Sequence, residues 1–189
     1  MKSFVRKLLG PLLLATTVFP ASRSSAAVDM FLKLADSRGT ILIQGESLDK
    51  QHPDEIVLSS FSQGVSVPIS NPVGGGGTGA GKASFSELSV AKLLDKASPL
   101  LYSYAAQGRR IPTVVLTVRK SGEKPVEFYR ITLTDVLISS VQTGGGGDVP
   151  SESLSLNFTK IEWRYTPQKA DGSPDAPVIA TWDLAANKP

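Results

Sequence analysis

The 189-residue sequence contains no cysteine, one histidine and two methionines. The absence of cysteine excludes a disulfide framework, a thiolate nucleophile and a cysteine-based zinc site. With His52 as the only histidine, the chain has little material for a transition-metal site or for a nucleophile–base pair. Covalent cross-links are not required for stability at this length, because a domain of ~150 residues buries roughly 68–70% of the surface of its unfolded chain. We therefore expect one core built by apolar packing alone.

Without its N-terminal residues, the chain also lacks an excess of positive or negative charge. The whole chain carries 20 basic and 17 acidic residues. Four of the basic residues and none of the acidic ones lie in residues 1–26, so the remainder has 16 basic and 17 acidic residues. A nearly neutral domain gives no electrostatic argument for nucleic-acid binding.

Long hydrophobic runs are confined to the N-terminus, and even this one is short. Lys2, Arg6 and Lys7 precede an apolar stretch at residues 8–19, and small residues follow it. This order is typical of a secretory signal peptide. The apolar stretch is shorter than the ~20 residues that a membrane-spanning helix needs.

The sequence therefore predicts a signal peptide at residues 1–26, cleaved after Ala26, with cleavage after Ala27 nearly as good. The mature domain, residues 27–189, is expected to be secreted or periplasmic and to have no membrane span. An uncleaved anchor and a misassigned start codon are the alternatives.

Strand-forming patterns dominate the mature chain, with apolar and polar residues alternating over short segments. The longest β-favouring stretch, residues 56–69, is interrupted near Gln63 and Gly64. Residues 135–143 either continue the strand before them or turn back. The predicted strands are residues 28–34, 56–69, 84–90, 112–119, 127–134, 154–158, 161–165 and 178–184.

A change of side-chain parity separates two of these segments. Leu154, Leu156 and Phe158 share one face, whereas the alternation from Ile161 onward has the opposite parity. The switch at residues 159–160 predicts a β-bulge or a strand that passes from one sheet to another.

One segment has the pattern of a helix. Ser98 is suited to the N-cap and Pro99 to the first helical position, where its missing N–H costs little. Gly108 is a natural residue just beyond the C-terminal end. The sequence thus predicts a single helix between these signals.

Glycine is concentrated in two places, since ten of the 17 glycines lie in residues 74–81 and 144–147. The first cluster, with Lys82, fits the phosphate-binding pattern G-x-x-x-x-G-K. A phosphate loop then needs Ser or Thr and a helix, whereas this chain has Ala83 followed by a strand-like segment at residues 84–90. We interpret both clusters as mobile surface loops.

His52 lies in a polar, turn-like stretch with Asp49, Asp54 and Glu55. We interpret it as a solvated or locally hydrogen-bonded histidine, because catalysis requires a nucleophile and an orienting acid beside the ring. The nearby carboxylates, with Glu46, do not have the spacing of a calcium loop.

Three aromatic residues, Trp163, Tyr165 and Trp182, lie on predicted strands and are expected in the core or at a subunit interface. We therefore predict no catalytic, cofactor-binding or metal-binding residue and no cofactor. The chain is interpreted as a structural subunit rather than an enzyme.

Four segments, in this order, resemble the Hcp family, the inner-tube proteins of bacterial type VI secretion. They cover nearly the whole chain after residue 26. The segments are AVDMFLKL at residues 27–34, IQGESLDKQHPDEI at 43–56, GAGK at 79–82 with DKASP at 95–99, and YTPQKADG at 165–172.

The resemblance implies a mainly β fold, an Hcp-like β-barrel of two antiparallel sheets with one flanking α-helix. It implies a non-enzymatic subunit whose hexameric rings stack into a tube that carries effectors. Spike, sheath and effector proteins are the implied partners, and residues 74–81 match the family's extended loop, which contacts stacked rings. Because such tubes are loaded from the cytoplasm, the signal peptide favours an alternative: an exported Hcp-like protein with a separate periplasmic or extracellular binding or assembly role.

Overall fold

The computed structural model describes residues 28–70, 79–122, 125–146 and 148–189. The expected signal peptide at residues 1–26 and its cleavage sites lie outside them. In the described part of the chain, no helix combines the length and apolar character needed to cross a bilayer. The elements are β1 (Val28–Ala35), β2 (Ile41–Ile43), β3 (Ile56–Val57), β4 (Ser60–Ser62), β5 (Val65–Ser66), β6 (Ile69–Ser70), β7 (Gly79–Ala80), β8 (Ser84–Phe85), β9 (Leu88–Leu93), α1 (Ser98–Gln107), β10 (Ile111–Lys120), β11 (Val126–Gly144), β12 (Ser151–Asn157), β13 (Lys160–Tyr165) and β14 (Val178–Asp183).

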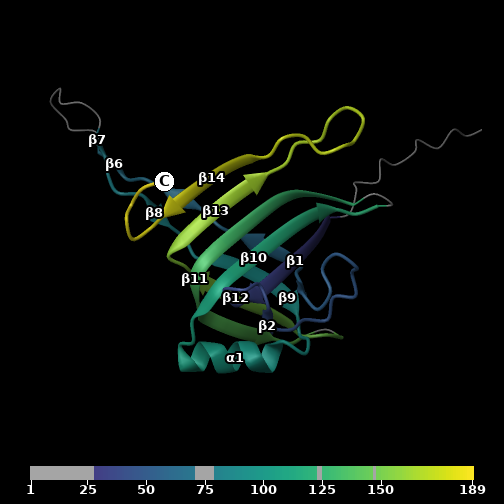
Figure 1. Ribbon diagram of the computed structural model, residues 1–189. Coiled ribbons are helices and arrows are strands. Elements are labelled where there is room, and N and C mark those ends of the chain that lie inside the picture. The colour runs from purple at the N-terminus through teal and green to yellow at the C-terminus, as the bar shows by residue number, and fades with distance from the viewer. Residues whose placement is uncertain (1–27, 71–78, 123–124, 147) are drawn as a thin grey trace, which may run out of the picture.

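Ten of the strands form one curved sheet with antiparallel pairing throughout (Figure 1). Its main path is β2-β1-β10-β11-β12-β9-β4, while β13 and β14 branch from β11 and β3 pairs with β1. Helix α1 lies at one end of the sheet and packs beside β11. The predicted mainly β class with antiparallel sheets and one helix is confirmed.

The predicted barrel is not closed, because no strand ladder among the described residues joins β4 to β2 at the two ends of the path. The gap is spanned by one continuous segment, in which β3 pairs with β1 and β4 pairs with β9. Single backbone hydrogen bonds mark the crossing. Leu58 N–H donates to Met30 O, and Ser59 N–H donates to Ala91 O. The segment crosses from β1 to β9 within a short stretch of chain, so it forms no full ladder with either strand.

The two parts of the sheet share the long strand β11. Up to Val136 this strand pairs with β10, and from Leu137 it pairs with β12. The change coincides with Asp135, whose φ is +54°, a backbone conformation that Asp tolerates better than most residues. Residues 135–143 therefore continue the preceding strand, which settles the choice that the sequence left open.

The parity switch at residues 159–160 marks a strand that changes partners, as predicted. Strand β12 pairs with β9 and with the second half of β11, whereas β13 pairs with the first half of β11 and with β14. The turn is fixed where Thr159 N–H donates to Thr134 O at 3.1 Å. Phe158 stays in the core before the switch and Ile161 re-enters it afterwards.

The core lies inside the curved sheet and is built from the alternating apolar positions. Burying such aliphatic side chains stabilises the fold by about 1.5–3 kcal/mol each. The outer face of β1 and β10 is also covered, because residues 44–55, called segment 44–55 below, fold back over it. The inner face contains Leu32, Leu34, Val114, Leu116, Ile131, Leu133, Leu154 and Leu156.

The helix was predicted correctly apart from its first residue. Gly108 ends it with a φ of +59°, and its N–H donates to Ala105 O. The N-cap position is occupied by Ala97 rather than Ser98, which is the first helical residue. The Ser98 hydroxyl instead donates to a buried carboxylate on β12, Glu152 Oε2, at 2.8 Å. The Ser98 oxygen accepts from Lys92 Nζ and from the Asp95 N–H, so both acceptor positions of the hydroxyl are used outside the helix.

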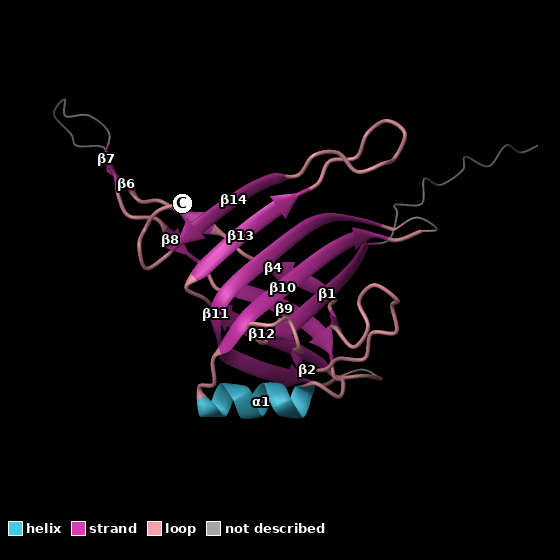
Figure 2. Cartoon of the chain, viewed as in Figure 1, coloured by secondary structure: helices cyan, strands magenta, loops and turns pink. Residues whose placement is uncertain are grey.

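A narrow β-hairpin arm leaves the body of the protein (Figure 2). Strand β5 pairs with β8 near the body, and β6 pairs with β7 farther out. The strands break at residues 63–64, as predicted. A Cβ on Gly81 would lie 2.7 Å from Pro68 Cγ, so a larger residue would force the two sides of the arm apart. Residues 74–78 of the predicted glycine loop, residues 74–81, lie outside the described residues.

Candidate functional site

His52 is buried rather than solvated, which corrects the sequence-based prediction. Its side chain stacks on Phe31 with ring centroids 4.3 Å apart and an interplanar angle of 10°. The predicted local contact is present, since Nδ1 lies 3.0 Å from Glu55 Oε2. No residue near position 52 predicts the second carboxylate, Glu127, whose Oε1 lies 3.3 Å from Nε2. The difference arises because segment 44–55 packs against the sheet.

Burial in this cluster affects the titration of Glu55. Loss of hydration raises the pKa of Glu55, and the adjacent His52 opposes that rise. Lys33 on β1 lowers the Glu55 pKa as well, whereas Glu127 raises it. The carboxylate is thus placed where its charged form depends on the cations around it.

A second polar cluster fixes the same segment through Arg119 on β10. One guanidinium nitrogen, Nη2, donates to Asp49 Oδ2 at 2.7 Å and to Asp29 Oδ2 at 2.8 Å. These contacts hold the pKa of Asp49 at about 2 and also lower the pKa of Asp29. The guanidinium carbon lies 5.0 Å from the ring centroid of Phe31. Arg119 therefore joins segment 44–55 to both β1 and β10.

A third cluster, around Lys92, was missed at the sequence level. Lys92 Nζ lies 2.9 Å from Glu152 Oε2 and 2.8 Å from Asp95 Oδ1. It also donates to Ser98 Oγ at 3.0 Å. The alternation of residues in β9 indicates this burial, since Leu88, Val90 and Lys92 share the buried face of the strand.

The carboxylates near His52 do not gather into a cation site. Glu46 Oε1 accepts the Lys96 N–H, and Asp54 pairs with Lys96 Nζ at 3.3 Å. Asp49 and Glu55 face different cations, as described above. In the described part of the chain, no three potential metal-ligating side chains come together.

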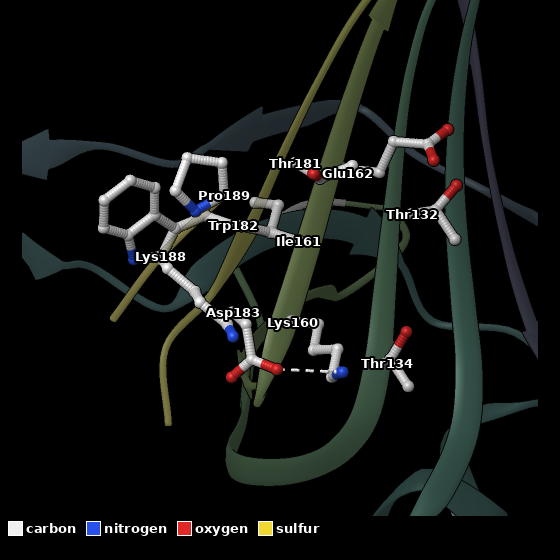
Figure 3. Close-up of a pocket in the computed structure, with 10 residues that line it drawn as sticks. All are labelled: Thr132, Thr134, Lys160, Ile161, Glu162, Thr181, Trp182, Asp183, Lys188 and Pro189. Carbon is white, nitrogen blue, oxygen red and sulfur yellow. Dashed lines mark ion pairs between the residues drawn. The ribbon is translucent and has the colours of Figure 1, made fainter. Parts of the chain in front are cut away.

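A surface hollow of about 360 Å³ lies over β13 and β14 (Figure 3). Its hydroxyl groups come from threonines on β11 and β14, and the only imidazole of the chain, His52, is not among its lining residues. Lys160 and Asp183 form an ion pair at 2.8 Å, which lowers the pKa of Asp183. The Glu162 carboxylate lies on β13 between its cross-strand partners Thr132 and Thr181. Its lining residues are Thr132, Thr134, Lys160, Ile161, Glu162, Thr181, Trp182, Asp183, Lys188 and Pro189.

The phosphate-loop pattern takes an extended conformation where it is described. Residues 79–80 form β7, and the chain enters β8 at Ser84, shortly after Lys82. A phosphate loop relies on backbone N–H groups at the start of a helix. Lys82 instead lies exposed on the hairpin arm. Residues 76–78 of the pattern lie outside the described residues.

Trp163 and Trp182 pack against the base of the arm. The ring centroid of Phe85 lies 6.1 Å from that of Trp163 and 5.9 Å from that of Trp182. Trp163 Nε1 also donates to Gln63 Oε1 at 3.2 Å. Tyr165, at the end of β13, is half exposed. Two of the three predicted aromatic residues therefore join the arm to the last strands.

Exposed apolar side chains remain on the hairpin arm and on the last strand. Within the described residues, β14 forms a ladder only with β13, and a bridge from Asp183 to Lys188 covers only the end of its other edge. Both faces of its first residues are exposed. An exposed apolar edge strand is a ready site for pairing with another chain. We call this the arm–edge surface, and its apolar residues are Val65, Val67, Ile69, Val178 and Ile179.

Comparison with known proteins identifies the family. A family model described as type VI secretion system effector, Hcp, matches residues 31–165. The protein hcp1 of Pseudomonas aeruginosa is 44% identical over 165 residues, which cover 85% of this chain and 98% of that protein. The chain belongs to the Hcp family.

Solved Hcp structures share the fold. A structure described as a type six secretion system protein has a TM-score of 0.78 and 31% sequence identity, covering 86% of this chain and 99% of the other. Hcp1 from Salmonella typhimurium has a TM-score of 0.68 and 31% identity, covering 86% and 98%. The family match runs from β1 to the end of β13 and includes His52, Arg119 and Lys92. The resemblance inferred from the four segments is confirmed.

Proposed function

We propose that this Hcp protein is a non-enzymatic structural subunit of type VI secretion. In this proposal its subunits form hexameric rings, and the rings stack into a tube that carries effectors. Spike, sheath and effector proteins are its partners. The observation that carries the proposal is the arm–edge surface, where apolar side chains cover a free strand edge and an arm that leaves the body.

Ring formation accounts for the exposed apolar groups. A closed ring uses two different surfaces of each subunit, so one free edge can meet another part of the neighbouring copy. Burial in such an interface stabilises assembly by roughly 25 cal/mol per Å² of apolar surface removed from water. A nearly neutral domain limits repulsion between stacked copies.

The test is the mass of the assembled protein. We expect residues 27–189 to give a six-fold species in native mass spectrometry and ring-shaped particles in electron microscopy. A protein that remains monomeric at high concentration contradicts the proposal.

Nucleotide binding is the first property to test against a non-enzymatic role, because residues 76–82 have part of a phosphate-binding pattern. A ligand at 100 times its Kd stabilises the folded state by about 2.7 kcal/mol. We expect ATP with magnesium to leave the melting temperature unchanged. A rise that disappears in Lys82→Ala overturns this expectation.

A second candidate is favoured by residues 1–26, which have the pattern of a cleaved signal peptide. In this case the domain at residues 27–189 is an exported Hcp-like protein, secreted or periplasmic, with a separate binding or assembly role. N-terminal sequencing of protein from fractionated cells separates the two. A chain starting at Ala27 or Val28 outside the cytoplasm supports export, and intact Met1 in the cytoplasm excludes it.

A further inference from the structure

The His52 cluster has a feature that a neutral imidazole does not satisfy. His52 Nδ1 is hydrogen-bonded to Glu55 Oε2 at 3.0 Å, whereas Nε2 is buried without a hydrogen-bond partner and lies 3.3 Å from Glu127 Oε1, within ion-pair distance. A neutral imidazole carries one N–H, so its other nitrogen presents a lone pair. With both carboxylates ionised, that lone pair faces a negative oxygen inside the protein. The geometry fits a trio that carries one additional proton.

We propose that His52, Glu55 and Glu127 share one proton at neutral pH, and that this proton holds segment 44–55 against the sheet. The proton resides either on the imidazole, giving an imidazolium between two carboxylates, or on one carboxyl group beside a neutral ring. The inference goes beyond the proposed function, because it concerns a single subunit and holds whatever that subunit assembles into.

The trio itself is negatively charged without the proton. Glu127 uses its other oxygen, Oε2, to accept from Arg130 Nη2 at 2.6 Å. Lys33 lies near enough to Glu55 to lower its pKa, while burial raises it. These cations each serve one carboxylate. Neither lies between a carboxylate and the His52 ring, because the ring nitrogens contact the carboxylate oxygens directly.

In the described part of the chain, Arg119 on β10 pairs with carboxylates outside the trio. Phe31 stacks on the imidazole, and the Arg119 guanidinium carbon lies 5.0 Å from the centroid of the same Phe31 ring. Arg119 is itself engaged by Asp29 and Asp49. Charge from β10 is therefore balanced within its own cluster. A proton on the trio remains the simplest way to remove the repulsion between the Nε2 lone pair and the Glu127 carboxylate.

The proton has a structural consequence, because His52 anchors the middle of segment 44–55. The ends of the segment are joined by backbone hydrogen bonds. Gly45 N–H donates to Asp54 O at 2.8 Å, Ser47 N–H to Glu55 O at 3.1 Å and Asp54 N–H to Ser47 O at 3.0 Å. Between them the Leu48 side chain is 98% exposed. Loss of the proton is expected to release this segment and the leucine that it presents.

The first experiment observes the proton directly. Since His52 is the only histidine, its ¹⁵N signals need no further assignment. At pH 7.5 the inference expects either two protonated ring nitrogens or a neutral ring with a protonated Glu55 or Glu127, visible in the carboxyl ¹³C shifts. A neutral ring between two ionised carboxylates overturns it.

The second experiment measures hydrogen exchange of the Gly45, Ser47 and Asp54 amides between pH 7 and 9. If opening of the segment releases one proton, protection corrected for intrinsic exchange falls by about tenfold per pH unit. The amide of Leu116 in β10 serves as an internal reference for global unfolding. Protection of the three amides that is independent of pH overturns the proposed role of the proton.

Variants distinguish the effect of the proton on the segment from the effect of side-chain packing. In Glu127→Gln the amide can donate to Nε2, so a neutral imidazole fits without an additional proton. The segment is then expected to stay closed, and the change in protection to fall below about twofold per pH unit. Glu162→Gln, on β13 and outside the cluster, is the matched control and should keep the wild-type pH dependence. An unchanged pH dependence in Glu127→Gln contradicts the assignment.

Discussion

Lys92 and Glu152 lie directly opposite each other on β9 and β12, with Nζ 2.9 Å from Oε2, and neither side chain has exposed surface. The same ammonium group contacts Asp95 and the first residue of α1, Ser98. The second oxygen of Glu152 accepts from Thr143 on β11 at 3.2 Å. This one ion pair therefore joins two strands of the sheet to a third strand and to the helix.

Removing one partner of this pair is expected to be costly. Lys92→Met leaves the Glu152 charge buried without its cation, and we expect a loss of about 3–5 kcal/mol in the free energy of unfolding. Denaturant unfolding measures it. Replacing both residues with apolar ones, Lys92→Met with Glu152→Leu, should recover most of the loss.

The control for this prediction is Lys160→Met, which breaks an exposed ion pair with Asp183. Exposed pairs contribute about 0–1 kcal/mol, so this change should be nearly neutral. If both single variants lose similar amounts of stability, the importance assigned to the buried pair is wrong.

The Asp49–Arg119 contact predicts a loss of stability in acid. Folding lowers the Asp49 pKa from 3.8 to about 2. Because the folded value is the lower one, the stabilisation is complete above the unfolded pKa and is lost as the pH falls toward the folded value. The stability difference between wild type and Asp49→Asn should thus be largest above about pH 5 and shrink toward pH 2. A difference that does not vary with pH rules out this linkage.

Gly45 is expected to tolerate no side chain. A Cβ at this position would lie 2.3 Å from Glu55 O and 2.5 Å from Ile56 Cα, both backbone atoms. Gly45→Ala should therefore lower the free energy of unfolding by about 1–3 kcal/mol through overpacking. Gly144→Ala is the control, since its Cβ would meet nothing within 4 Å. Thermal unfolding of the two variants compares them, and equal melting temperatures contradict the prediction.

The arm–edge surface predicts a selective defect in assembly. A lysine at Ile179, 46% exposed on β14, should prevent burial of this edge and leave the subunit folded. Light scattering is expected to show a smaller species with an unchanged circular dichroism spectrum. Leu100→Lys, at 47% exposure on α1, is the matched control. Full assembly of Ile179→Lys excludes this edge from the interface.

Local patterns in the sequence predicted most of the elements, because they depend on nearby backbone geometry. The alternation in β10 and β11, the parity switch after Phe158 and the αL residue Gly108 all appear as expected. The N-cap was wrong because the Ser98 hydroxyl accepts from Lys92 Nζ and the Asp95 N–H and donates to Glu152, a residue 54 positions away. A buried ion pair between two strands therefore takes the side chain that the local pattern assigned to the cap.

The candidate site was less predictable, because its partners are distant in sequence. The sequence predicted a solvated or locally hydrogen-bonded His52, and the local contact with Glu55 is present. The ring is also covered by Phe31 from β1 and faces Glu127 from β11. No sequence pattern near residue 52 predicts these contacts. They follow from the way segment 44–55 closes over the sheet.

The sequence by itself determined the mainly β class, the single helix and the Hcp family, since each depends on periodicity or on ordered short segments. Only the tertiary structure decided that the sheet stays open between β4 and β2, and that Lys92 meets Glu152 across 60 residues. The alternation of apolar and polar residues predicts which face of the sheet a side chain lies on. Strand register and the closure of the chain decide which residues it contacts there, and both are set by packing over the whole domain.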